Sequence, residues 1–262
     1  MSFLEALLLG LVQGLTEFLP VSSSGHLAIG KEILNIESEN LAFEVAVHAA
    51  TVLSTIVVFR KEIFSLILGA LKFRKNYETT YLIKIAISMI PVFIVGIFFK
   101  EFVESIFGSG LIIVGVSLLV TSSLLVLTHF IKSKERELKN RDAFMIGVAQ
   151  ALAVLPGLSR SGATISTGLM LGVKREEIAR FSFLMVLVPI LGEAFLEMIS
   201  GDFSSASTGI EPFSLLVGFT AAFVSGLFAC KVMIALVKRA KLTGFALYCL
   251  VLGALTILWT LI

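Results

Sequence analysis

Charged side chains are scarce in this chain: Asp, Glu, Lys and Arg make up 15% of its 262 residues, against about 25% in soluble domains. The net charge of +2 is small, which argues against a nucleic-acid partner. The only two cysteines, Cys230 and Cys249, lie in separate apolar segments without metal-ligand spacing, so both are interpreted as packing residues. The first apolar run has no Lys or Arg before it, which disfavours a cleavable signal peptide.

Hydrophobic residues are abundant instead, at 57% of the chain, and many fall in runs of span length. About 20 consecutive apolar residues are needed to cross a bilayer as a helix. We therefore predict an all-α integral membrane protein that forms a single membrane domain over residues 1–262. The apolar stretch 62–71 within the basic loop 60–84 is predicted to lie at the interface. Six transmembrane helices are predicted, at 41–59, 82–99, 110–130, 181–200, 212–237 and 243–262.

Two further apolar segments are interrupted by prolines and polar residues. Residues 3–30 are broken by Pro20 and the bend SSSG, and residues 143–173 are broken by Pro156-Gly157. Neither contains a comfortable uninterrupted span, so each is predicted to be a re-entrant helical hairpin that enters the membrane and returns. A bend of this kind is tolerated at depth only inside protein or beside a water-filled cavity.

The distribution of basic residues predicts an orientation. Of the 21 Lys and Arg residues, 18 fall in the segments 60–84, 132–141, 174–180 and 231–241, which the positive-inside rule assigns to the cytoplasm. Threading the chain accordingly places both termini outside. It also makes the first hairpin open outward and the second hairpin open to the cytoplasm.

Each half of the chain is then one hairpin followed by three spans, and because three is odd the second half is inverted. The halves are residues 1–131 and 143–262, joined by a cytoplasmic linker at 132–142. Local likeness supports this inverted-topology repeat: Gln13 matches Gln150, and FIVGIF (93–98) resembles FVSGLF (223–228). Such repeats hold their site near the membrane midplane, where the two hairpin tips are expected to meet.

The tip of the first hairpin carries unusual polar chemistry for an apolar segment. Gln13 and Glu17 are four residues apart and share a helix face, and a carboxylate at that depth indicates function unless it only caps the bend. The serines after Pro20 offer hydroxyls and backbone N–H groups at a helix start, which suits an anion as well as a simple N-cap. His26 has the spacing of a base or acid for those hydroxyls. The candidates are Gln13, Glu17, Ser22, Ser23, Ser24, Gly25 and His26.

The tip of the second hairpin carries Arg160, a basic residue between apolar arms. Its guanidinium requires an anionic partner, and its planar fork suits phosphate. The alternative is an ion pair with Glu17 that only ties the hairpins together. Around it lie further donors, namely Ser159, Ser161, Gly162 and Thr164.

We interpret the remaining polar residues of the spans mainly as structural. Glu44 and His48 interrupt the span 41–59. His48 is interpreted as a hydrogen-bonded packing residue, with a place in the site as the alternative. Glu193 and Glu197 lie toward the predicted outer end of their span, where they can reach water.

Two of these motifs resemble a known family over essentially the whole chain. GLVQGLTEFLPVSSSGH carries an (E/Q)xxxE pattern as Gln13 and Glu17, and PGLSRSGAT carries PGxSRSxxT from Pro156 to Thr164. Both are similar to the undecaprenyl-diphosphatase family, the bacitracin-resistance phosphatases. The resemblance implies hydrolysis of undecaprenyl diphosphate, a bilayer lipid, to undecaprenyl phosphate and inorganic phosphate. This recycles the lipid carrier for the cell wall in the bacterial cytoplasmic (inner) membrane.

The resemblance also implies a divalent cation, Mg²⁺ or Ca²⁺, and a site open to the outer face. It further implies reduced sensitivity to bacitracin, which acts only indirectly by sequestering the same diphosphate lipid. Glu17 with Gln13 is the expected metal ligand set, although Gln13 leaves one carboxylate fewer than a glutamate would. Ser23 is the expected nucleophile, His26 its base or acid, and Arg160 the phosphate clamp, with direct attack by water as the competing chemistry. A homodimer is compatible with the sequence.

Two other classes compete with an enzyme. A lipid-phosphate flippase or transporter would use the same midplane groups, because inverted repeats with broken helices are typical of transporters. A scaffold without a small-molecule site is disfavoured, since a midplane Arg and Glu would be costly without purpose.

Overall fold

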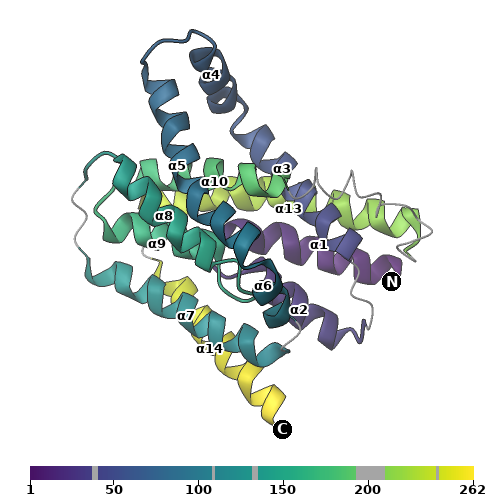
Figure 1. The fold of residues 1–262 in the computed structure, drawn as a ribbon. Coiled ribbons are helices and arrows are strands. Elements are labelled where there is room, and N and C mark those ends of the chain that lie inside the picture. Colours follow the sequence, from purple (N-terminus) through teal and green to yellow (C-terminus); the bar gives the residue numbers. More distant parts are fainter. Residues whose placement is uncertain (37–40, 108–109, 132–134, 193–209, 240–241) are drawn as a thin grey trace.

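The computed structural model describes residues 1–36, 41–107, 110–131, 135–192, 210–239 and 242–262 (Figure 1). These ranges are helical, and a single isolated bridge joins Arg136 and Val173 within them. The helices are α1 (Phe3–Phe18), α2 (Ser23–Ile33), α3 (Leu41–Val58), α4 (Arg60–Ala70), α5 (Tyr77–Phe98), α6 (Lys100–Phe107), α7 (Leu111–Phe130), α8 (Asn140–Leu152), α9 (Arg160–Met170), α10 (Arg175–Met185), α13 (Pro212–Arg239) and α14 (Thr243–Leu261).

Within the described ranges, four helices are long and apolar enough to cross a membrane. They are α5, α7, α13 and α14, and the bent pair α3–α4 brings the number to five if it counts as one span. Large apolar side chains remain exposed along these helices, for example Leu247, Leu255 and Trp259 on α14. Such extended apolar surfaces are rare on soluble monomers and suit contact with lipid.

One predicted span agrees with an observed helix to within one residue, and another is only partly described. The helix over 41–59 ends at Val58, and α4 leaves it at an angle of 75°. The stretch 62–71, predicted to lie at the interface, is therefore helix α4, and Phe64 and Ile67 project from it into the surroundings. In the predicted span 181–200, α10 ends at Met185 with Val186 as its C-cap, and residues 193–200 lie outside the described part of the chain.

The first predicted hairpin is broken where its sequence indicated. Leu19 precedes Pro20 and takes an extended conformation, because the proline ring clashes with a helical residue before it. Ser22 then adopts a φ of 69°, in the left-handed region that non-glycine residues rarely occupy. Its side chain accepts a hydrogen bond from the backbone N–H of Gly25 and caps α2.

The second predicted hairpin is built in the same way. Helix α8 ends before Pro156, and Gly157 turns the chain with a φ of 87°, which a residue without Cβ adopts at little cost. Ser159 caps α9 by accepting from the N–H of Gly162 at 3.0 Å. Each break therefore consists of a proline, a left-handed residue and a serine cap.

The arms of the two broken units pack on helices from the opposite half of the chain. Helix α1 lies along α13, and α8 lies along α5. Small residues allow both close approaches: a Cβ added to Gly10 would lie 2.3 Å from the Gly218 carbonyl oxygen, and one added to Gly147 would lie 2.2 Å from that of Ser88. Close contact through small residues is the usual way in which membrane helices associate.

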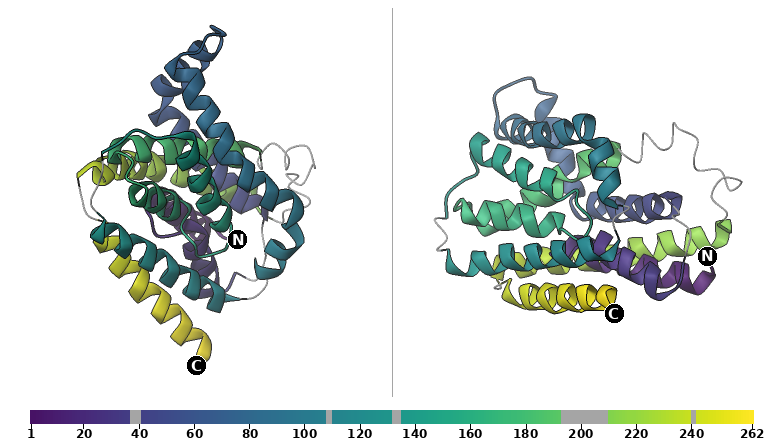
Figure 2. Two further views of the ribbon diagram at one scale, coloured as in Figure 1. Left: turned by 60° about the vertical axis from the view of Figure 1, so that its left-hand side comes forward. Right: turned by 60° about the horizontal axis from the view of Figure 1, so that its bottom comes forward.

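Helices α7 and α14 pack against each other, at the edge of the bundle opposite α4 (Figures 1 and 2). Their crossing is also close, because a Cβ on Gly253 would lie 2.8 Å from the Gly115 carbonyl oxygen. Helix α7 contacts both α2 and α9, so the two breaks meet beside it. The Thr121 hydroxyl accepts a hydrogen bond from the N–H of Ser159 at 3.0 Å, which anchors the second break to α7.

Candidate active site

The centre of the polar cluster is the carboxylate of Glu17, near the end of α1. Its Oε2 accepts hydrogen bonds from Gln13 Nε2 at 2.9 Å and from Ser23 Oγ at 2.6 Å. The Glu17 side chain is 8% exposed and Gln13 is fully buried. The predicted shared face of Gln13 and Glu17 is therefore present, and the bend returns Ser23 to it.

The second break reaches the first through Ser161, whose hydroxyl donates to the Leu19 carbonyl oxygen at 3.1 Å. Glycines permit the approach: a Cβ on Gly25 would lie 3.0 Å from the Cα of Gly157, and one on Gly162 would lie 3.4 Å from the Cβ of Pro20. The tips of the two broken units are thus in contact.

Arg160 is the first residue of α9 and faces a cavity that Glu17 also lines. The positive charge of Arg160 attracts the negative charge of the Glu17 carboxylate. Within the described part of the chain, no side-chain hydrogen bond or ion pair engages its guanidinium. Ser161 and Thr164 line the same cavity, so four of the predicted site residues share it.

The cavity is small, at about 20 Å³, which is room for roughly one water molecule. The aromatic rings of Phe18 and Phe183 form part of its wall and meet edge to face at 5.9 Å. This space is too small for a diphosphate group, the ligand that the sequence motifs led us to expect.

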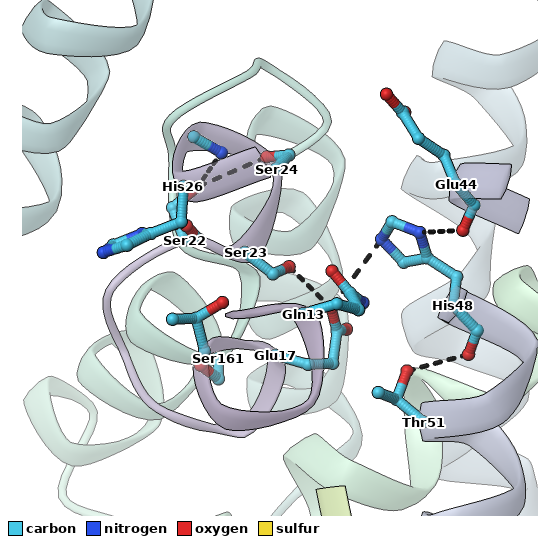
Figure 3. Close-up of polar contacts among 12 residues, drawn as sticks. Gln13, Glu17, Ser22, Ser23, Ser24, His26, Glu44, His48, Thr51 and Ser161 are labelled. Carbon is cyan, nitrogen blue, oxygen red and sulfur yellow. Dashed lines mark hydrogen bonds and ion pairs between the residues drawn. The ribbon is translucent and has the colours of Figure 1, made fainter. Parts of the chain in front are cut away.

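His26 forms its side-chain hydrogen bonds with groups other than the serine hydroxyls that its spacing suggested. Its Nδ1 donates to the Ser22 carbonyl oxygen at 2.7 Å, and its Nε2 lies 2.6 Å from the Tyr248 hydroxyl of α14. The two rings stack with centroids 5.6 Å apart, and Figure 3 shows the imidazole directed away from Ser23 and Glu17. Helix α2 begins at Ser23 as expected, but its rotation about its own axis turns His26 toward α14.

The remaining serines of the two tips shape the breaks. The hydroxyls of Ser22 and Ser24 lie 3.3 Å apart, and so do those of Ser159 and Ser161. The Thr164 hydroxyl lies 2.6 Å from that of Ser182 on α10. Ser182 carried no sequence signal that separated it from other serines in apolar helices.

His48, on α3, directs a ring nitrogen at the Glu17 carboxylate. Its Nε2 lies 3.7 Å from Glu17 Oε2, and its Nδ1 donates to the Glu44 carbonyl oxygen at 2.8 Å. Figure 3 shows the ring directed at the Gln13 and Glu17 side chains. Glu44 itself forms an ion pair with Lys31. Glu193 and Glu197 lie outside the described residues.

Donors for a cation are few. No group of three or more His, Cys, Asp and Glu side chains that could hold a metal occurs in the described ranges. However, the buried Oε1 of Gln13 has no hydrogen-bond partner there, although a buried carbonyl oxygen normally has one. An unpaired amide oxygen beside a carboxylate fits a hard divalent cation that takes oxygen ligands.

These features define a multi-pass helical membrane protein with a buried polar site between two broken helical units. The chain belongs to the family described as bacitracin resistance protein BacA, which matches residues 6–255. Similar proteins are an undecaprenyl-diphosphatase of Parabacteroides distasonis, 57% identical over 267 residues and covering 100% of both chains, and one of Bacteroides fragilis, 57% identical over 262 residues and covering 98% of each. An undecaprenyl-diphosphatase of Korarchaeum cryptofilum is 40% identical over 262 residues, with 97% of each chain covered.

Proposed function

We propose that this chain hydrolyses undecaprenyl diphosphate to undecaprenyl phosphate and inorganic phosphate. Full-length relatives at 57% identity are undecaprenyl-diphosphatases. The observation that carries the proposal is the pairing of Ser23 Oγ with Glu17 Oε2 at 2.6 Å, beside a cavity that Arg160 lines. Phosphoryl transfer requires a nucleophile, a proton acceptor and a positive group that binds phosphate. Ser23, Glu17 and Arg160 supply these three groups in that order.

In the first step, Ser23 Oγ attacks the terminal phosphorus of the diphosphate, and its proton passes to the Glu17 carboxylate. The bond between the phosphorus and the bridging oxygen breaks, and undecaprenyl phosphate leaves. Arg160 binds the oxygens of the transferred phosphoryl group, because its guanidinium has no competing side-chain partner among the described residues. In the second step, water attacks the phosphoserine and its protons stay with the inorganic phosphate that leaves, while the bond from phosphorus to Ser23 Oγ breaks and Ser23 regains its proton from Glu17.

Glu17 takes the role of base that the sequence suggested for His26. The Ser23 hydroxyl already donates to Glu17, whereas both ring nitrogens of His26 have other partners. His26 instead stabilises the left-handed conformation of Ser22 by donating to its carbonyl. Backbone strain of this kind persists only where neighbouring groups hold it.

Glu17 and Gln13 would hold the divalent cation, Mg²⁺ or Ca²⁺, through the carboxylate and the unpaired amide oxygen. When bound, it supplies charge neutralisation for the diphosphate.

For the topology, we propose six transmembrane helices and two re-entrant hairpins in an inverted repeat. The repeat halves are residues 1–131 and 143–262, with 132–142 as the cytoplasmic linker. Support comes from the reciprocal packing: with Gly10 matched to Gly147, the facing residues Gly218 and Ser88 match as well, by the alignment of FVSGLF with FIVGIF. The close contact of α1 with α13 is thereby repeated between α8 and α5.

The protein is then placed in the bacterial inner membrane, with both termini outside and the site open to the outer face. The cytoplasmic assignment of the basic segments supports this orientation. Bacitracin would affect this protein only indirectly, by binding the same lipid substrate. The homodimer stays a prediction.

Purified protein incubated with a C55 diphosphate lipid, with and without chelator, tests the activity by the release of inorganic phosphate. Release that requires the cation supports the proposal, whereas a flippase or transporter would release none. Rapid quenching tests the covalent step: phosphoserine at position 23 is expected. Full activity in Ser23→Ala would eliminate that step and leave direct attack by water.

A further inference from the structure

His48 is held with one ring nitrogen directed at the proposed cation site. The Glu44 carbonyl oxygen can only accept a hydrogen bond, so Nδ1 of His48 is the donor in their 2.8 Å contact. In the neutral ring, Nε2 therefore carries a lone pair rather than a proton. That lone pair faces Glu17 Oε2 at 3.7 Å, a contact that is an ion pair when the ring is protonated and places two acceptors opposite each other when it is neutral.

The separation is too long for a hydrogen bond, which ends at about 3.5 Å. It is close to the distance between two ligands of one metal ion. Nitrogen and oxygen ligands each lie ~2.1 Å from a first-row metal such as zinc, and in its tetrahedral geometry they are ~3.4 Å apart. The observed 3.7 Å is slightly wider than that separation.

Gln13 provides an independent sign of a missing partner at the same place. Its side chain is fully buried, its Nε2 donates to Glu17, and its Oε1 has no partner within the described ranges. The amide, the carboxylate and the imidazole converge in Figure 3. The three donors come from two helices, α1 and α3, so the tertiary packing assembles them.

We propose that His48 Nε2 is the third protein ligand of the cation, beside Glu17 and Gln13. This rests on the proposed function, since the cation is the one assigned to that reaction. An imidazole nitrogen is a poor ligand for Mg²⁺ and Ca²⁺ and a good one for later first-row metals. The site is therefore a mixed nitrogen and oxygen site, in which the imidazole adds most to the binding of later first-row ions such as Co²⁺.

The role of the neighbouring groups follows. The Glu44 carbonyl is the outer partner that fixes the tautomer and orientation of His48, as is usual for histidines that bind metals. His26 cannot take this role, because its two nitrogens are engaged by Ser22 and Tyr248. With three histidines in the chain, a signal from a coordinated imidazole can be assigned by substitution.

The test uses the purified full-length chain, freed of metal by chelation and then loaded with Mn²⁺. Pulsed electron paramagnetic resonance is expected to detect the nitrogen-14 coupling of a directly bound imidazole. His48→Gln should abolish this coupling. His129→Gln, which alters a histidine near the end of α7, should keep it. No nitrogen coupling in the unmodified protein overturns the proposal without reference to any variant.

Calorimetric titration adds a second measurement. His48→Gln is expected to lower Co²⁺ affinity by at least ~10–100-fold, the loss seen even for outer-shell partners, and Ca²⁺ affinity by much less. Unchanged Co²⁺ affinity overturns the proposal. Phosphate release is measured on the same preparations: release with Mg²⁺ but no nitrogen coupling removes only the His48 ligand, whereas coupling without release removes the proposed reaction.

Discussion

Replacing Arg160 with methionine removes the guanidinium and keeps much of the side-chain volume. Among the residues that line the cavity, Arg160 is the basic one. Arginines that act on a transferred phosphoryl group contribute 10³-fold to 10⁵-fold to turnover. We expect a loss of kcat/KM of about 10³-fold, which corresponds to about 4 kcal/mol of transition-state stabilisation.

The lower end of the range applies because part of the anion site survives the change. The start of α9 still presents backbone N–H groups toward the tip, and its N-cap, Ser159, is untouched. A helix start attracts anions by itself. Arg160→Lys keeps the charge but loses the planar fork, so its loss should be intermediate.

The assay is phosphate release from a C55 diphosphate lipid by the purified variants, with Arg141→Met as the control on an exposed arginine. Folding is checked by thermal unfolding in the same detergent. The attraction between the Arg160 charge and the Glu17 carboxylate adds a double-substitution test: Glu17→Gln should recover part of any stability that Arg160→Met loses. A correctly folded Arg160→Met protein with turnover within tenfold of the unmodified chain would refute the phosphate-binding role.

Three further outcomes are expected. Gly147→Ala should destabilise the protein by about 1–3 kcal/mol through overpacking at the α5–α8 contact, whereas Gly96→Ala, which faces open space, should not; thermal unfolding compares them. Tyr248→Phe removes the hydroxyl bonded to the imidazole of the first bend and should lower kcat more than it raises KM. The Arg136 guanidinium holds the pKa of Asp142 below its ordinary value. The ion pair therefore stabilises the folded protein above about pH 4, and this stabilisation is lost as the pH falls through the lowered pKa. Asp142→Asn should flatten that acidic part of the curve of folding stability against pH.

Each of these has a contradicting result. Equal unfolding temperatures for the two glycine variants would remove the close helix contact as a source of stability. Unchanged kinetics for Tyr248→Phe would mean that the bend keeps its shape without the hydroxyl. An acid transition that is the same in Asp142→Asn as in the unmodified chain would exclude this ion pair as its cause.

Local signals predicted the breaks well. Pro20 and Pro156 act through the backbone of their immediate neighbours, so their effect is readable from the sequence. The i, i+4 spacing of Gln13 and Glu17 likewise depends on one helix only, and the observed hydrogen bond between them follows from it.

The partners that belong to different helices were not readable. The period of α2 indicates which residues share a face but not which way that face turns, and the Tyr248 hydroxyl that receives His26 lies 222 positions along the chain. His48 resembled any single histidine in an apolar helix. Its significance depends on α3 lying beside α1, a contact that no local pattern predicts. The end of the span at residue 59 was predicted to within one residue, but the 75° angle after Val58 was not readable, because no proline or glycine stands at that point.

The contact of α1 with α13 has a consequence for biogenesis. Helix α1 acquires its main neighbour only after the whole stretch between Phe18 and Pro212 has been synthesised, because α13 begins at Pro212. Until then the Glu17 carboxylate has to remain in a partly assembled bundle. The packing of the helix that carries Glu17 therefore depends on α13, and a protein truncated before α13 should be inserted yet inert.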